Sequence, residues 1–395
     1  MRHYAIIGAG ISGCTAAEAL ASHGHEVELI ESADRLGGSV LNYTCKATDE
    51  CSRCGVCVAH TQLAKALTHP RIHLSLGASI SSASSHDGTV AISFRHNNPT
   101  IVYQSCIGCD QCVHACPEHC ITKIHRGEVI QYVIDYANCL LHKGQSCTIC
   151  SEACPTNAIL AESATSERSV TSDGILIATG HEPYDATQRV RLGYGRLDNV
   201  MTGVEAEEIL RRQTHLRHPS DSIAFIQCVG SRDPRIGRNY CSSVCCAYAL
   251  RLAQIIKYRN AETPVTIYYI DLQNFDKNFT AFKKTLEARG VQLIRGVPFA
   301  VEASRNGRVK LSIEQMDGEE SIVEHDLVVL SVGMGPCSNA ESLASLFGLR
   351  QDEFGFFSSS ELQVFVSGTC QEPLSISDSM ARARAVAFEM GSFGG

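Results

Sequence analysis

The sequence carries 20 cysteines in 395 residues, and most of them fall in short runs of fixed spacing. The runs read Cys-x2-Cys-x2-Cys-x3-Cys-Pro at 106–117 and Cys-x2-Cys-x3-Cys-Pro at 147–155, with Cys139 eight residues ahead of the second run. Thiolates at this spacing hold cubane iron–sulfur centres, and the proline after each last cysteine turns the chain away. Zinc is the less specific alternative.

In two-cluster bacterial ferredoxins, which these runs resemble, the fourth cysteine of each run ligates the other cluster. We therefore expect two [4Fe–4S] clusters in a ferredoxin-like insertion. The ligands are Cys106, Cys109, Cys112 and Cys154 for the first cluster, and Cys116, Cys139, Cys147 and Cys150 for the second. The second run has seven residues between its first two ligands, where two are usual, so a longer loop is expected there. Cys120 is left over, and we expect it to be a packing residue, with ligation as the alternative.

Another cysteine group follows a strand at 222–227 and leads into a helix expected at 247–258. The group comprises Cys228, Cys241, Cys245 and Cys246. Four thiols at one strand–helix junction favour a third iron–sulfur cluster, with buried free cysteines as the alternative. Adjacent cysteines of a helix point in different directions, so Cys245 and Cys246 need a turn, or only one is a ligand.

A fourth group comprises Cys45, Cys51, Cys54 and Cys57. Its Cys-x2-Cys-x2-Cys spacing predicts a fourth cluster, with Cys45 as the remaining ligand. A zinc site and redox or packing cysteines remain the alternatives.

The elements that position these groups begin with a dinucleotide fingerprint. A strand at 4–7 leads into a glycine-rich turn and a helix at 14–23, and a second strand at 27–30 ends in an acidic residue. The glycines permit a tight turn and close approach of a pyrophosphate, the helix N-terminus attracts phosphate, and the acid accepts from ribose hydroxyls. The candidate binding residues are Gly8, Gly10, Ser12, Gly13 and Glu31.

Three further segments resemble the two-dinucleotide flavoproteins. They are Arg35-Leu36-Gly37-Gly38, the Ala178-Thr179-Gly180 turn after a strand, and Val364–Thr369, where Thr369 takes the position of the usual Asp. The resemblance implies FAD rather than NAD in this site, and a final helix at about 377–390 with its positive end toward the flavin. It adds the candidates Arg35, Gly38, Thr179, Gly180, Gly368 and Thr369.

The resulting fold class is α/β: a two-dinucleotide-binding, Rossmann-like flavoprotein with an inserted ferredoxin-like two-cluster module. We expect FAD-domain segments at 1–100, 163–215 and 331–395, the insertion at 101–162, and a second Rossmann-like domain with the cysteine-rich site at 216–330. This second domain continues with a strand at 265–270, a helix at 275–289 and a strand at 291–294. The serine-rich segments 81–85 and 164–172 predict turns or linkers. We expect Cys337 and Cys370 to pack within loops.

The composition of the chain argues against some classes of function. The formal net charge of −8 argues against binding nucleic-acid phosphates through a basic face. The sequence has neither an apolar run long enough for a membrane span nor a signal-peptide pattern at its start. We expect a cytoplasmic protein that associates with membranes only through partners.

The strings IAFIQCVGSRD, NYCSSVCCAYALRLA, SVGMGPCSNAESLASLFGL and SGTCQEPLSISDSMARA resemble the A subunit of heterodisulfide reductase over nearly the whole chain. The resemblance, which extends to the A subunit of quinone-interacting oxidoreductases, implies an oxidoreductase of anaerobic metabolism with FAD and several clusters, one of them on the 228–246 cysteines. It implies an oligomeric assembly with iron–sulfur, thiol/disulfide or quinone-side subunits. Ferredoxin, or the hydrogenase or dehydrogenase component of such a complex, is a further implied partner. Because the chain looks like a short form, flavin-based bifurcation is less expected. Arg251, five residues after Cys246, is the candidate cation for a reduced flavin or cluster, with a solvated surface arginine as the alternative.

Two alternatives remain open. An NAD(P)H-dependent flavin reductase with an appended ferredoxin module needs a phosphate-binding turn in the second domain, where Val229-Gly230-Ser231 is a poor one. A non-catalytic iron–sulfur scaffold or redox sensor needs no flavin. Direct flavin–disulfide exchange is not expected, because the positions of the usual Cys-x4-Cys dithiol are Val40 and Cys45.

Overall fold

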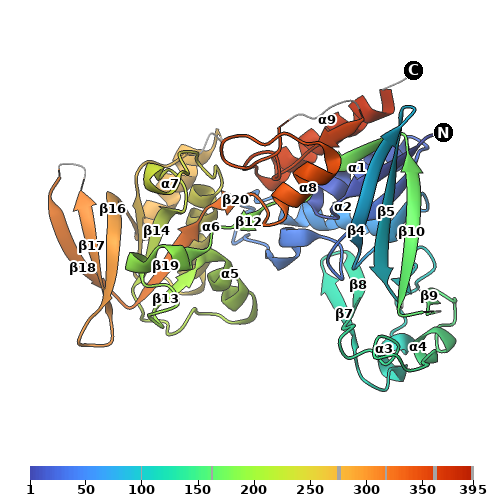
Figure 1. Ribbon diagram of the computed structural model, residues 1–395. Coiled ribbons are helices and arrows are strands. Elements are labelled where there is room, and N and C mark those ends of the chain that lie inside the picture. The colour runs from blue at the N-terminus through green and yellow to red at the C-terminus, as the bar shows by residue number, and fades with distance from the viewer. Residues whose placement is uncertain (99, 162, 274–276, 316–317, 359–362, 393–395) are drawn as a thin grey trace.

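The computed structural model describes residues 1–395 except 99, 162, 274–276, 316–317, 359–362 and 393–395. Figure 1 shows two lobes, with both labelled chain ends in the lobe that holds α1 (Ile11–Ser22) and α9 (Ile376–Ser392). The lobes are joined where β12 (Glu182–Pro183) pairs with β20 (Met334–Gly335) in a short antiparallel ladder. The chain therefore leaves the first lobe through one of these strands and returns to it through the other.

The first lobe is built on a five-stranded parallel sheet in the order β21-β11-β1-β2-β3. Its strands are β1 (His3–Ile7), β2 (Glu26–Ile30), β3 (Ile72–Ser75), β11 (Gly174–Ile177) and β21 (Val364–Val366). The last four residues of β1 and all of β11 are buried, as expected for central strands of a parallel sheet that is covered on both faces.

Helices and a second sheet cover the two faces. One face packs against α1 (Ile11–Ser22), α2 (Val56–Thr68) and α9 (Ile376–Ser392). The other face packs against α8 (Ala340–Phe347) and an antiparallel sheet of β10 (Thr165–Ser172), β5 (Thr89–Asn97) and β4 (Ser79–His86). The short 3-10 helix η1 (Gly38–Asn42) follows the Gly37-Gly38 turn.

The prediction of turns or linkers at 81–85 and 164–172 is wrong. These segments form most of β4 and β10, which flank β5 in antiparallel pairing, with one register shift between Ile80 and Ser82 on the β4 side. The serines lie mostly on exposed positions, while β5 contributes the buried Val90, Ile92 and Phe94. Pairing with a hydrophobic neighbour therefore overrides the low strand preference of a serine-rich sequence.

The segment at 101–162, for which a ferredoxin-like insertion is predicted and which keeps that name below, projects from the first lobe in the lower part of Figure 1. Its elements are β6 (Thr100–Ile101), α3 (Gln111–Ala115), β7 (Ile121–Arg126), β8 (Val129–Ile134), α4 (Ile149–Glu152) and β9 (Ile159–Leu160). β6 pairs with β9, so the two ends of the segment meet, and β7 pairs with β8 as a hairpin.

The second lobe contains a seven-stranded sheet in the order β13-β19-β14-β15-β16-β17-β18. Its strands are β13 (Val200–Thr202), β14 (Ile223–Val229), β15 (Val265–Tyr269), β16 (Val291–Ala303), β17 (Val309–Gln315), β18 (Glu320–His325) and β19 (Leu327–Val332). The first five strands are parallel, and β17 and β18 extend the sheet as an antiparallel hairpin.

The helices of the second lobe are α5 (Gly203–Arg212), α6 (Cys245–Arg259) and α7 (Phe279–Ala288), with 3-10 helices η2 (Ala186–Gln188), η3 (Val190–Leu192) and η4 (Pro234–Ile236). α6 begins two residues before the predicted start and includes both adjacent cysteines. The predicted start of α7 at Phe275 lies outside the described residues. The two parallel α/β units agree with the predicted fold class. Within the described chain, no helix has the length and apolarity that a bilayer crossing requires.

Candidate dinucleotide cavity and cysteine sites

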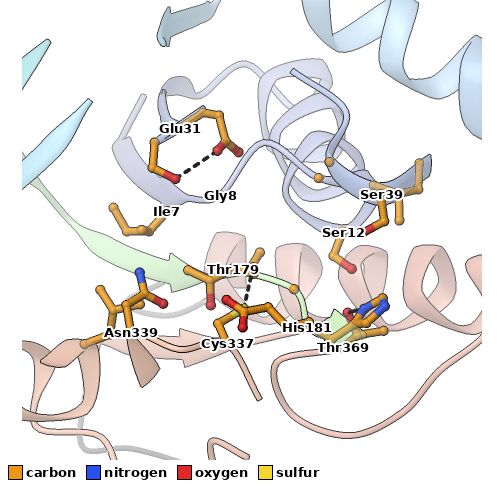
Figure 2. Close-up of a pocket in the computed structure, with 18 of the residues that line it drawn as sticks. Ile7, Gly8, Ser12, Glu31, Ser39, Thr179, His181, Cys337, Asn339 and Thr369 are labelled. Carbon is orange, nitrogen blue, oxygen red and sulfur yellow. Dashed lines mark hydrogen bonds between the residues drawn. The ribbon is translucent and has the colours of Figure 1, made fainter. Parts of the chain in front are cut away.

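A cavity of about 740 Å³ opens at the carboxyl ends of β1, β2 and β11, where parallel α/β sheets bind their ligands. Figure 2 shows Gly8 and Glu31 on one side of this cavity and Thr179, Cys337 and Asn339 on the other. Most of the predicted dinucleotide residues line it: Gly8, Gly10, Ser12, Glu31, Gly38, Thr179, Gly180 and Thr369.

Each of the three fingerprint positions, 8, 10 and 13, favours glycine for a different structural reason. Gly8 has a φ of +104°, and a Cβ there would lie 2.4 Å from the carbonyl oxygen of Ala178 on the neighbouring strand end. A Cβ on Gly13 would lie 1.9 Å from the Gly8 carbonyl oxygen, so this glycine lets α1 pack against β1 and does not line the cavity. A Cβ on Gly10 would meet no described atom within 4 Å and faces open space, as expected beside a bound phosphate.

Glu31 is held in a fixed position by backbone N–H groups. Its Oε2 accepts from Ala9 N at 2.7 Å, and its Oε1 accepts from Ala33 N at 2.8 Å. The carboxylate therefore spans the end of β2 and the glycine-rich turn, at the edge of the cavity where a ribose would be recognised.

Besides Gly13, two further predicted binding residues lie outside the cavity lining. The Arg35 guanidinium is 3.9 Å from the Asp34 carboxylate, and both side chains are partly exposed. Gly368 lies behind Ser12, because a Cβ at 368 would be 2.2 Å from Ser12 Oγ. Gly368 therefore acts by letting the last FAD-type motif approach the N-terminus of α1.

His181 is a cavity residue that the sequence reasoning missed. Its Nδ1 lies 2.9 Å from Thr369 Oγ1, and Figure 2 shows this pair next to Ser12. Burial lowers the pKa of His181 to about 4, so the imidazole is neutral at neutral pH. The only sequence signal for this residue is its position directly after the Ala178-Thr179-Gly180 turn.

The polar groups that line the cavity fit a polar, phosphate-containing ligand. Thr179 Oγ1 lines the cavity, is buried and has no hydrogen-bond partner in the described structure. Together with the open space at Gly10, this unpaired hydroxyl leaves polar groups that a bound dinucleotide would satisfy.

Cys337, which we expected to pack in a loop, also lines the cavity. Its thiol donates to the Thr179 carbonyl oxygen at 3.3 Å, and burial raises its pKa to about 12. Cys370 is buried outside the lining, with its thiol directed to backbone carbonyls of Ile177 and Ser367. Val40 lines the cavity and Cys45 is exposed, so the described cavity wall holds one thiol rather than a dithiol.

The ferredoxin-like segment contains two smaller cavities walled by cysteines. One is lined by Cys106, Cys109, Cys112 and Cys154, which is the set expected for the first cluster. The other is lined by the second expected set, Cys116, Cys139, Cys147 and Cys150, and also by Cys120. The fourth cysteine of each run thus faces the cavity of the other run.

The thiols that line these two cavities differ in pKa. Burial raises the pKa of Cys112 and of Cys150 to about 11. At Cys154 burial acts in the same direction, but the backbone N–H groups of Thr156 and Ala158 outweigh it and lower the pKa. No three Cys, His, Asp or Glu side chains of the described residues close around a single metal ion. Four thiols around one cavity suit a polynuclear centre better than one ion.

The middle cysteine group converges at the β14–α6 junction. The Cys245 thiol donates toward Cys228 and Cys246, which lowers the pKa of both and raises that of Cys245. Cys241 is close enough for the charge of Cys228 to raise its pKa further, after burial. Cys245 and Cys246 both lie in the first turn of α6, and both are buried. Both thiols therefore belong to the cysteine group, although the backbone that carries them is helical.

Arg232 is the cation next to these thiols. Its guanidinium forms a bidentate ion pair with Asp271 and also hydrogen-bonds Cys228. The sequence reasoning missed Arg232, whose left-handed φ of 55° turns the loop after β14.

This thiol group adjoins the wall of the dinucleotide cavity. Met334, which lines the cavity, donates its N–H to the buried Ser242 Oγ at 3.1 Å. Tyr240 OH donates to the Met334 carbonyl oxygen at 2.8 Å. The segment that carries Cys241 is therefore hydrogen-bonded on both sides to the connection between the lobes.

The loop with the fourth cysteine group packs against α6. Arg251 Nε donates to the Ser52 carbonyl oxygen at 3.1 Å, and Gln254 Nε2 donates to Thr48 Oγ1 at 3.2 Å. Cys45, Cys51 and Cys57 are exposed and Cys54 is half-buried, and within the described residues no hydrogen bond joins any two of these thiols. Arg251 does not line the dinucleotide cavity. Its hydrogen bond to Ser52 instead holds it to the loop that carries the fourth cysteine group.

The family described as pyridine nucleotide-disulphide oxidoreductase matches residues 2–387. Over 97% of its length the chain is 30% identical to the A subunit of the H(2):CoB-CoM heterodisulfide,ferredoxin reductase of Methanothermobacter marburgensis, of which it covers 62%. It is also 30% identical to the A subunit of the ferredoxin/F(420)H(2)-dependent CoB-CoM heterodisulfide reductase of Methanosarcina acetivorans, with 98% and 52% covered. The chain thus spans about three-fifths or less of these relatives. The predicted resemblance to heterodisulfide reductase A subunits is confirmed.

Among solved structures, the Thermoplasma acidophilum thioredoxin reductase superposes with a TM-score of 0.56 at 14% identity, covering 99% of both chains. The Lactococcus lactis thioredoxin reductase gives a TM-score of 0.55 at 14% identity, covering 100% of this chain and 99% of the other. At this identity the likeness supports the fold alone.

Proposed function

Because this chain belongs to the pyridine nucleotide-disulphide oxidoreductase family and is an oxidoreductase, we propose that it is the electron-transfer flavo-iron–sulfur subunit of a heterodisulfide-reductase-like complex. In this proposal FAD occupies the large cavity, and electrons travel between FAD and partner subunits through [4Fe–4S] clusters. The family supports the assignment as a flavoprotein, and the cysteine sites of this chain are the proposed route for the electrons.

The observation that carries the proposal is the thiol group at the β14–α6 junction beside the cavity wall. In a second Rossmann unit, this turn is where a pyrophosphate would lie against a glycine-rich loop. Here the junction is occupied by four thiols, and its neighbour Ser242 is hydrogen-bonded to the cavity residue Met334. Thiolates of this kind hold an iron–sulfur centre, which transfers single electrons.

The chain's own residues would hold FAD in the cavity. Gly10 and the N-terminus of α1 accept the pyrophosphate, and Glu31 accepts from the adenosine ribose. His181 and Thr369 form a neutral hydrogen-bonded pair where the related motif has an acidic residue, so this side of the cavity adds no charge next to the phosphates. Bound FAD exchanges electrons either singly or in pairs, which connects two-electron donors to one-electron centres.

We propose the two cavities of the 101–162 segment as the sites of two further clusters, with ligands exchanged between the two cysteine runs. The discontinuous FAD-domain segments and the second Rossmann-like domain belong to the same proposal. The relatives are named as A subunits of CoB-CoM heterodisulfide reductases, which implies that those enzymes contain other subunits. We propose that this chain assembles with such subunits and that an acceptor docks on the 101–162 segment, with bifurcation as an activity of the whole complex.

The test is anaerobic purification of the full chain with quantification of flavin, iron and acid-labile sulfide. We expect one FAD and about 12 irons per chain from three cubane clusters, or about 16 if the fourth cysteine group binds one. Dithionite should give several distinct cluster signals by electron paramagnetic resonance. Co-purification with redox subunits should follow when the chain is expressed with its natural complex.

The family description favours one competing function, an NAD(P)H-dependent flavin reductase. Adding NADH to the isolated, flavin-loaded chain distinguishes the two. We expect no bleaching of the flavin absorbance without partners, because the β14–α6 turn offers thiols instead of a phosphate site. Rapid stoichiometric bleaching by NADH, with no cluster on the 228–246 cysteines, would contradict our proposal.

A further inference from the structure

The ferredoxin-like segment is an approximate internal repeat, and one of the differences between its halves places a cysteine where the other half has an alanine. Cys116-Pro-Glu-His-Cys120-Ile121 corresponds to Cys154-Pro-Thr-Asn-Ala158-Ile159. The residues before this position, His119 and Asn157, share a left-handed backbone with φ of 49° and 53°. Ile121 and Ile159 then begin β7 and β9. Cys120 is therefore the structural counterpart of Ala158.

The cavities preserve this correspondence. Ala158 lines the first cavity together with four cysteines, and Cys120 lines the second together with four other cysteines. The second cavity thus has five thiols for a cluster that takes four ligands. Cys120 is 6% exposed, so the fifth thiol is enclosed rather than a surface group.

Cys120 contacts the expected ligands directly. Its Sγ lies 3.4 Å from the Sγ of Cys116, within hydrogen-bond distance for sulfur, and it also interacts with the Cys139 thiol. A thiolate that ligates iron is an acceptor only, so the proton in this contact belongs to Cys120. At the first cavity the equivalent alanine has no side-chain donor, and Cys154 accepts from the Ala158 backbone N–H at 3.2 Å.

We propose that Cys120 is a non-ligating hydrogen-bond donor to the Cys116 thiolate, and that it raises the reduction potential of the second cluster. Reduction adds negative charge to the cluster and its sulfurs, so an S–H donor stabilises the reduced form more than the oxidised form. This inference rests on the proposed clusters and adds a positioning residue to them.

The experiment uses the full chain, purified anaerobically with its clusters, in a redox titration followed by electron paramagnetic resonance. Cys120→Ala copies the other half of the repeat and should keep the iron and sulfide content. It should lower the reduced-to-oxidised ratio of one cluster about tenfold at a fixed potential, a shift of about 59 mV for one electron. Cys120→Ser keeps a donor and should recover most of the shift. The reciprocal Ala158→Cys should raise the potential of the other cluster.

Two results would overturn the inference while leaving the proposed function intact. Loss of about four irons in Cys120→Ala would make Cys120 a ligand. Full iron content with unchanged potentials in both Cys120→Ala and Ala158→Cys would make it a packing residue. Absence of both clusters from the wild-type segment would overturn the proposed function as well, and the wild-type iron content distinguishes that failure from the other two.

Discussion

Lys46 donates its Nζ proton to the Glu207 carboxylate across the boundary between the lobes, and the two side chains are only 3% and 1% exposed. Glu207 also accepts from Thr44 N at 2.7 Å. The Lys46 ammonium lies 5.4 Å and 5.3 Å from the ring centroids of Tyr43 and Tyr248. Because Tyr43 lines the dinucleotide cavity and Tyr248 belongs to α6, this buried pair connects the cavity wall to the helix that begins with Cys245.

Breaking this pair from one side should destabilise the interface between the lobes. Lys46→Met leaves the Glu207 carboxylate buried without its partner, a change that typically costs about 3–5 kcal/mol. We expect a lower melting temperature and faster proteolytic cleavage in the 43–55 loop. The double variant Lys46→Met with Glu207→Leu removes both charges and should recover much of the loss. Equal damage from the single and double variants would show that the ion pair does not hold the lobes together.

The fingerprint glycines allow binding to be separated from folding. Gly13→Ala forces a Cβ against the Gly8 carbonyl and should destabilise the protein. Gly10→Ala meets no described atom within 4 Å, so it should fold normally and weaken FAD binding tenfold or more. Fluorescence titration of the apoprotein with FAD, together with thermal melting, measures both effects. Normal FAD affinity in Gly10→Ala would place the pyrophosphate elsewhere.

The lowered pKa of His181 predicts a pH effect on the apoprotein. The imidazole ordinarily titrates near 6.5 in an unfolded chain and here near 4. Between these values the unfolded chain binds more protons, so stability falls as pH drops from about 6.5 toward 4. His325, whose pKa burial also lowers to about 4, contributes in the same direction. His181→Gln should flatten the dependence of melting temperature on pH between 7 and 5, and a slope identical to the wild type would contradict the neutral state of His181.

The parts of the site that the sequence predicted depend on short-range spacing. The glycine turn and the two ferredoxin-like runs carry their geometry in residues a few positions apart, so pattern alone indicated them. His181 and Thr369 are 188 residues apart, and their contact arises only when β11 and β21 pair. The serine-rich strands β4 and β10 depend on pairing with β5, and no local signal marks that pairing. Long-range packing therefore accounts for what the sequence reasoning missed.

The two arginines near α6 give opposite predictions. Arg232 hydrogen-bonds Cys228, and its positive charge lowers the pKa of Cys228 and Cys246 after the effect of the Cys245 thiol. A fixed cation stabilises a cluster that gains negative charge, so Arg232→Gln should lower the reduction potential of the cluster on this group. Arg251→Gln removes the bond to Ser52 and should loosen the 43–55 loop without that shift. A lowered potential in Arg251→Gln but not in Arg232→Gln would instead support the role first expected for Arg251.

Whether the fourth cysteine group binds a cluster decides the number of cofactors, and the iron content of the purified chain answers this. Its loop is fastened to the second lobe by Arg251, by Gln254 and by the 3.1 Å ion pair of Arg289 with Asp49. A loop fixed at several points can hold four thiols around a cluster even though three of them are exposed here. We expect Cys54→Ala to lose about four irons, while FAD and the other cluster signals stay unchanged. Cys370→Ala removes a buried thiol outside every expected ligand set and serves as the matched control. An iron content of about 12 in both the wild type and Cys54→Ala would mean that this loop carries no cluster and acts only as the packing element between the lobes.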